Sequence, residues 1–274
     1  MMDFFLLLIK TVAFRPYVFL FLAISLFSAH RLLGWRRTGL FFGLTCLIAF
    51  TCEFSSTRTG IPFGWYHYTG STVGRELYLG NVPLMDSLSF TYLLYASYCL
   101  ALFILLPTCQ LSLAARTSWP VFGLSVLFFV LIDMVIDPVA LRGDRWFLGR
   151  IYYYPEPGVH FGVPLANYIG WGVVGTIALS IYLPLDRRLP PLEHGDDQPV
   201  TAQVLLGCGL YCSVLLFIVA VTFWIGEPVL GLAGLLMYLP ITALFLFRLL
   251  KRSTAARHDY GSRTVIDPRW RSDT

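Results

Sequence analysis

The sequence predicts an all-α, polytopic integral membrane helix bundle with about seven transmembrane helices. Hydrophobic residues make up 57% of the 274-residue chain, charged residues make up only 13%, and the mean hydropathy is +0.68. Soluble domains carry about 25% charged residues, so this composition indicates a membrane protein. Apolar stretches of about 20 residues, the length that crosses a bilayer, also recur along the chain.

Seven such stretches are separated by polar or Gly- and Pro-rich segments. The segment before the first stretch, Met1 to Phe14, is apolar but contains Asp3 and Lys10, and no small-residue cleavage site follows it, so we expect an interfacial helix or an extension of the first span. Residues 1–252 form a single predicted transmembrane domain, and the polar residues 253–274 form a flexible tail. The expected spans are roughly 16–33, 39–55, 86–106, 119–140, 165–183, 201–224 and 229–250.

Basic residues are distributed unequally between the two ends of the predicted bundle. With seven spans, the side that contains the C-terminal tail receives thirteen of the 20 Lys and Arg residues. Cytoplasmic loops are enriched in these residues, which predicts a cell-membrane protein with a cytoplasmic C-terminus and its two long aromatic loops outside. The same loops and tail account for the net charge of +4, so the charge does not indicate a nucleic-acid partner.

Four acidic residues lie at or near the ends of apolar spans: Glu53, Asp86, Asp133 and Asp137. A carboxylate in the hydrocarbon layer costs about 2.5–3.5 kcal/mol on insertion scales, so an acid at such a position suggests a functional site. Asp133 and Asp137 are four residues apart and share one helix face. Two carboxylates on a buried face resist ionising together, so one of them is expected to keep its proton.

The two long loops follow one design, which predicts a parallel internal repeat. In the first unit Glu53 precedes an aromatic loop that ends in Val-Pro-Leu-Met-Asp86. In the second unit Asp133 precedes an aromatic loop that ends in Val-Pro-Leu-Ala-Asn167. Proline is favoured in the first turn of a helix, so each motif opens a returning span. Such repeats place their site at the interface between the two halves.

Structural explanations remain open for each acid. Asp137 could pair with Arg142, Arg145 or Arg58, and Glu53 could pair with Arg58. Asp86 falls in a first helical turn, where the helix dipole favours an anion. The aromatic residues around the acids could form an interfacial belt. Their density instead suggests that they contact the substrate or a cationic intermediate, and the expected set is Tyr66, His67, Tyr68, Asn167, Tyr168 and Trp171.

Several classes of chemistry lack the motifs they require. The five histidines are scattered, no GxGxxG or P-loop is present, and the six cysteines form no CxxC pair. The Asp133-x3-Asp137 spacing is similar to the Mg²⁺-diphosphate motifs of membrane prenyltransferases, but those enzymes need a second Asp-rich segment. The sequence therefore predicts proton chemistry with no metal and no cofactor.

These motifs together resemble the CruF-type carotenoid biosynthesis family, which includes carotenoid 1,2-hydratases and the archaeal bisanhydrobacterioruberin hydratase. The resemblance covers roughly residues 40–185 and rests on five elements. They are Glu53, Thr59-Gly-Ile-Pro-Phe-Gly-Trp-Tyr-x-Tyr68, Gly80-Asn-Val-Pro83, Asp133-x3-Asp-Pro138 and Gly162-Val-Pro-x-x-Asn-Tyr-x-Gly-Trp171. It implies cofactor-free addition of water to the terminal C=C of an acyclic carotenoid, giving a tertiary alcohol.

The resulting expectation is a hydro-lyase whose partners are a carotenoid, water, membrane lipid and other carotenoid-pathway enzymes. Asp133 is the expected acid, Asp137 keeps it protonated, Glu53 or Asp86 acts as the base, and Asn167 positions water. A carotenoid end-group cyclase would start with the same protonation, and a non-catalytic carotenoid-binding subunit would need no acid. The sequence does not distinguish among these three, nor does it identify the carotenoid.

Overall fold

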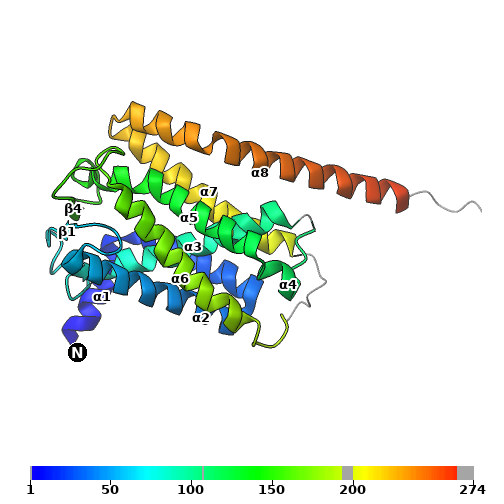
Figure 1. The fold of residues 1–274 in the computed structure, drawn as a ribbon, viewed down its shortest axis with the longest axis horizontal. Helices are drawn as coiled ribbons and strands as arrows, with labels where there is room; N and C mark the ends of the chain where they lie inside the picture. The colour runs from blue at the N-terminus through cyan, green and yellow to red at the C-terminus, as the bar shows by residue number, and fades with distance from the viewer. Residues whose placement is uncertain (1, 107, 193–199, 264–274) are drawn as a thin grey trace, which may run out of the picture.

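The computed structural model describes residues 2–106, 108–192 and 200–263. Its long helices lie side by side along one axis, with the two long loops gathered at one end, and the C-terminal part of the last helix extends beyond the other end (Figure 1). Six of the described helices are long and apolar enough to cross a membrane. This architecture confirms the predicted all-α polytopic membrane bundle.

Helices supply almost all of the regular structure, and the strands are two-residue pieces within the loops. In chain order the elements are α1 (Met2–Phe14), α2 (Pro16–Thr59), β1 (His67–Tyr68), β2 (Tyr78–Leu79), β3 (Val82–Pro83), α3 (Leu84–Leu105), α4 (Leu113–Arg116), α5 (Trp119–Ala140), a 3₁₀ turn (Gly143–Arg145), β4 (Tyr152–Tyr153), α6 (Leu165–Asp186), α7 (Thr201–Trp224) and α8 (Pro228–Arg263).

Helix α2 contains a reversal of the chain. Gly34 has φ 76° and ψ 165°, a conformation that is accessible to glycine and costly for other residues. Tyr17 and Glu53, from the two arms, both lie near Asp86, because each lines a cavity that Asp86 also lines. The arms are therefore antiparallel, and α2 supplies the first two predicted spans. The reversal also returns the N-terminal segment to the end of the bundle that carries the loops.

Helix α3 forms the centre of the bundle. Most of its side chains are buried, and it packs against α2, α5 and α7. Its first turn carries Asp86, so this acid lies in the middle of the loop end. Helices α5 and α6 pack against each other beside it and carry the second pair of predicted site residues.

The two long loops pair with each other over the helix ends. Strand β1 pairs antiparallel with β4, which places Tyr68 opposite Tyr152. The first loop is also held against α6, because a Cβ at Gly170 would lie 2.1 Å from the Phe63 ring, so only glycine permits this contact. Cross-loop pairing is compatible with two equivalent units, but the internal repeat remains a prediction.

An ion pair beneath the loops ties both of them to the N-terminal segment. Arg15, between α1 and α2, donates to both carboxylate oxygens of Glu76 at 3.0 and 2.9 Å. Its third contact is the carbonyl oxygen of Leu148 in the second loop, at 2.7 Å. Both charged side chains are fully buried. Bidentate Arg–carboxylate geometry fixes position as well as charge, so Arg15 holds the two loops in register.

A second buried ionic cluster lies at the opposite end of the bundle. Asp186, at the end of α6, accepts hydrogen bonds from Arg37 in the second arm of α2 and, at 2.9 Å, from Arg116 in α4. All three side chains are buried. The cluster joins three helices and has no counterpart among the sequence predictions.

The membrane orientation remains a prediction, which labelling of introduced cysteines would test. The exposed Ser71 and Val159 lie in the two loops, and the exposed Arg188 follows α6 at the other end. With the native cysteines replaced, Ser71→Cys and Val159→Cys should react with a membrane-impermeant thiol reagent in intact cells, whereas Arg188→Cys should react only after lysis. Labelling of Arg188→Cys alone in intact cells would indicate the opposite orientation.

Helix α8 continues to Arg263, and residues 264–274 of the predicted tail lie outside the described residues.

Candidate active site

The first acid pair joins α2 to α3 through a tyrosine from the first loop. The Tyr68 hydroxyl lies 3.0 Å from Glu53 Oε1 and 2.6 Å from Asp86 Oδ2, and Ser87 donates to the other oxygen of Glu53. A phenol carries one proton, so it donates to only one of the two acids. The remaining contact is a hydrogen bond only if the other carboxyl group is protonated. The Tyr68 hydroxyl therefore links Glu53 to Asp86.

The second acid pair lies on α5 and is bridged by α6. Asp133 and Asp137 are one turn apart on the same helix face, as their spacing indicates. Asn167, in the first turn of α6, donates to both, with its Nδ2 2.8 Å from Asp133 Oδ2 and 2.9 Å from Asp137 Oδ2. The Val-Pro-Leu motif thus places Asn167 where one amide group fixes the distance between the two carboxyl groups.

The two aspartates of this pair have different environments. Asp137 accepts hydrogen bonds from Asn167, from Tyr152 and, at 3.0 Å, from Tyr154, which suits an ionised carboxylate. Asp133 is fully buried, and its Oδ1 is one of the few buried side-chain oxygens without a partner in the described structure. An unpartnered anionic oxygen is very costly in such a site. These contacts favour the neutral form of Asp133 and the ionised form of Asp137.

The tyrosines that contact the acids occupy alternate positions along the loop strands. Burial and then the carboxylates of Asp86 and Glu53 raise the pKa of Tyr68 well above its usual value. Burial and then Asp137 likewise raise the pKa of Tyr152 and Tyr154. These phenols therefore stay protonated and act as hydrogen-bond donors to the acids.

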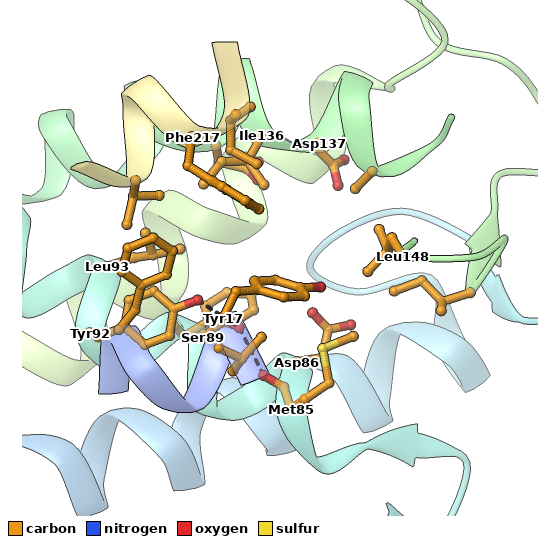
Figure 2. A pocket seen from close by; sticks show the side chains of 18 of the residues that line it. Tyr17, Met85, Asp86, Ser89, Tyr92, Leu93, Ile136, Asp137, Leu148 and Phe217 are labelled. Carbon is orange, nitrogen blue, oxygen red and sulfur yellow. Dashed lines mark hydrogen bonds between the residues drawn. The ribbon is translucent and has the colours of Figure 1, made fainter. Parts of the chain in front are cut away.

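Two cavities adjoin the acids. The first, the apolar cavity, has a volume of about 100 Å³ and lies between the first arm of α2, α3, α5 and α7 (Figure 2). Its walls are aliphatic and aromatic except near Asp86, Asp133 and Asp137. Figure 2 shows Asp86 and Asp137 on the right of the view, with Phe217 and Leu93 on the left. A lipid-soluble molecule in the cavity would thus contact carboxyl groups at one point.

The second cavity, the polar chamber, is smaller, at about 40 Å³, and lies under the paired loops. It is lined by Glu53, Asn167 and loop tyrosines, which can bind water. The two cavities share a wall, which separates an apolar compartment containing Asp133 from a polar compartment containing Glu53. The shared residues are Asp86, Phe90, Asp137, Tyr152 and Trp171.

The basic residues considered as partners for the acids make other contacts. Arg58 donates to Asn81 at 2.8 Å, and both Arg142 and Arg145 pair with Glu227 in the turn between α7 and α8. Hydrogen bonding to these arginines lowers the pKa of Glu227, although its slight burial opposes this. Within the described residues no Lys or Arg forms a salt bridge with the four acids. Their partners are the hydroxyl and amide groups described above.

Most of the predicted site residues meet at these cavities, and two do not. The four acids, Tyr66, Tyr68, Asn167 and Trp171 all line one or both cavities. His67 lies instead in an outer hollow with Trp65 and Glu156. Tyr168 lies outside both cavities, and its hydroxyl is 2.6 Å from Nδ1 of His160.

Several residues of the site were not among the predicted site residues. Tyr152 and Tyr154 bind Asp137, and Phe90 stacks on Trp171 with ring centroids 4.1 Å apart. The spacing of the two tyrosines could have identified them, because residues two apart in a strand share one face. No sequence pattern identifies Phe90, since aromatic residues are common in apolar spans.

Comparison with known proteins now identifies the family. The family model described as "Carotenoid biosynthesis protein" matches residues 6–240. The chain belongs to this carotenoid biosynthesis family. The chain is 34% identical over 212 residues to the bisanhydrobacterioruberin hydratase of Haloarcula japonica, and the match covers 73% of this chain and 67% of the relative. No solved structure matches it.

Proposed function

We propose that this protein is a carotenoid hydratase that adds water to the terminal C=C of an acyclic carotenoid by acid–base catalysis. One observation carries the proposal. A buried carboxyl group with an unpartnered oxygen, Asp133 Oδ1, lies at an apolar cavity that shares a wall with a polar chamber. Membership of the carotenoid biosynthesis family and similarity to a protein named as a hydratase support the same reaction.

The first step assigns the proton transfer to Asp133. Its carboxyl group donates a proton to the less substituted carbon of the terminal double bond, which breaks the π bond and forms a C–H bond. The tertiary cation at the dimethyl carbon is placed beside the stacked rings of Phe90 and Trp171 in the shared wall. A desolvated aromatic face stabilises a cation by about 2 kcal/mol. The Asp137 carboxylate adds electrostatic stabilisation.

The second step uses the polar chamber. A water molecule in the chamber attacks the cation across the shared wall and forms the C–O bond. Asp86 takes the proton that this water loses, because it lines both cavities and lies 2.6 Å from Tyr68, which links it to Glu53. The N–H groups of Asn167 bind the two aspartates, so this residue contacts water through its amide oxygen. Return of one proton to Asp133 completes the cycle.

The polar chamber favours hydration over the two alternatives. A cyclase would need the same acid but would have to exclude water from the cation. A non-catalytic binding subunit would need the apolar cavity but would not need buried acids. The multi-pass fold supports a location in a cell membrane, where both the carotenoid and water reach the site.

Expression of the chain in a host that accumulates lycopene tests this proposal. The expected pigments are heavier than lycopene by the mass of one or two water molecules. A product of unchanged mass but altered chromatographic behaviour would indicate cyclisation, and unchanged lycopene would support a binding subunit. In membranes supplied with heavy-oxygen water under anaerobic conditions, the new hydroxyl groups should carry the heavy oxygen. Oxygen derived from O₂ would contradict hydration.

A further inference from the structure

The apolar cavity is bounded on one side by three aromatic residues that lie between it and the outside of the bundle. They are Tyr17 and Phe21 from the first arm of α2 and Phe217 from α7, and we call them the entrance residues. Phe217 stacks on Tyr17 with ring centroids 5.5 Å apart and meets Phe21 edge-on at 5.9 Å. Figure 2 shows Phe217 and Tyr17 among the labelled residues that line the cavity.

This side of the cavity is closest to lipid. Each entrance residue is partly exposed, whereas Phe90, Leu93 and Trp171 on the inner walls are each 7% exposed or less. The neighbours of the entrance residues in sequence face outward, since Leu20 is 58% and Leu216 is 68% exposed. In a multi-pass membrane protein, apolar side chains exposed at this depth face lipid.

The contacts that close this side can open at low cost. Phe21 and Phe217 have no polar side-chain atoms, so rotation of their rings breaks no hydrogen bond. The inner walls are different, because Asp86, Asp137 and Tyr152 are held by hydrogen bonds among the four acids and their partners, which we call the acid centre. An apolar molecule dissolved in the membrane would therefore reach the acids between α2 and α7.

We infer that Tyr17, Phe21 and Phe217 form a lateral entrance through which the end of the polyene enters from the lipid, and that Phe217 selects slender, uncyclised ends. This inference rests on the proposed function. A cavity of about 100 Å³ behind three touching rings admits an open isoprenoid chain more readily than the wider ring of a cyclised end. The size of the side chain at position 217 thus sets which carotenoid ends reach Asp133.

The test compares two variants with a matched control on the same helix. Phe217→Trp narrows the entrance and should raise KM for an acyclic carotenoid about tenfold with little change in kcat. Phe217→Ala widens it, so a carotenoid with two cyclised ends should inhibit this variant but not the wild type. Leu216→Trp adds the same ring on the lipid-facing neighbour and should behave as the wild type does. Unchanged KM in Phe217→Trp, or continued indifference of Phe217→Ala to the cyclised carotenoid, would overturn the inference.

A second measurement separates this inference from the proposed reaction. Protein purified from a lycopene-producing host should retain pigment, and Phe217→Trp should retain less than wild type or Leu216→Trp. If the wild type retains pigment but yields no water-added product, the proposed hydration is contradicted. The inferred entrance is then still tested by pigment retention. Equal retention in all three proteins would overturn the entrance. Phe21→Trp provides a second narrowing variant and should show the same loss if Phe217→Trp does not fold.

Discussion

Asp133→Asn is expected to lower the rate of hydration by on the order of 10²–10⁴, the usual contribution of a positioned general acid. The amide keeps the size of the side chain and can still accept the hydrogen bond from Asn167, so the variant should fold and insert normally. What it loses is the acidic proton of a carboxyl group that lines the apolar cavity and has an unpartnered oxygen, Oδ1. Product yield per folded protein, measured in membranes with excess carotenoid, gives the effect directly.

Asp144→Asn is the matched control for this substitution. Asp144 is exposed in the 3₁₀ turn of the second loop and lines neither cavity, so the same chemical change there should leave the rate unaltered. Thermal unfolding in detergent should show similar stability for both variants. Hydration by Asp133→Asn within threefold of the control would remove Asp133 from the acid role and leave Asp137 as the next candidate.

Arg15→Ala is expected to destabilise the protein by about 3–5 kcal/mol, because it leaves the buried carboxylate of Glu76 without its partner. It also removes the contact to Leu148 O, so both loops lose their anchor above the acid centre. The measurements are the midpoint of unfolding in detergent and the rate of proteolysis in the two loops. The midpoint should fall, proteolysis should become faster, and hydration activity should decrease.

Two further variants make this prediction specific. Arg75→Ala removes an exposed arginine next to Glu76 in the first loop and should have little effect on stability. The double substitution Arg15→Met with Glu76→Leu replaces both charges with apolar side chains and should recover much of the lost stability, since neither charge is then left unpaired. An Arg15→Ala protein as stable as Arg75→Ala would show that the ion pair contributes little.

The sequence was sufficient to predict the positions of the spans and of the acids, because both depend on local rules. Apolar length identifies the spans, the four-residue spacing puts Asp133 and Asp137 on one face, and the first-turn proline places Asn167. These features need no knowledge of tertiary contacts. The membrane bundle was therefore predictable in class and approximately in boundaries.

The alternation of side chains in an extended segment explains why His67 lies outside the two cavities. Tyr66 and Tyr68 face the polar chamber, so the residue between them faces the opposite side of the strand. A strand prediction for this segment would have excluded His67 from the acid centre. The segment is short and surrounded by Gly and Pro, so its strand signal was weak. The same reasoning applies to Tyr152 and Tyr154.

Long-range pairing is what the sequence could not supply. Arg15 and Glu76 are 61 residues apart, and each could have been an ordinary charged residue at a membrane surface. The Arg37–Asp186–Arg116 cluster joins three segments that no local pattern relates. Only the fold shows that these charges are buried and paired.

Helix α6 carries a buried polar cluster at each of its ends. Asn167 is bound to the two aspartates near its start, and Asp186 is bound to two arginines at its end. At a rise of about 1.5 Å per residue these two positions are separated by roughly 28 Å. That length is close to the roughly 30 Å thickness of a bilayer's hydrocarbon core. The two buried clusters fix the axial position of the helix at both ends. We expect the acid centre and the arginine cluster to lie near the two boundaries of the hydrocarbon layer.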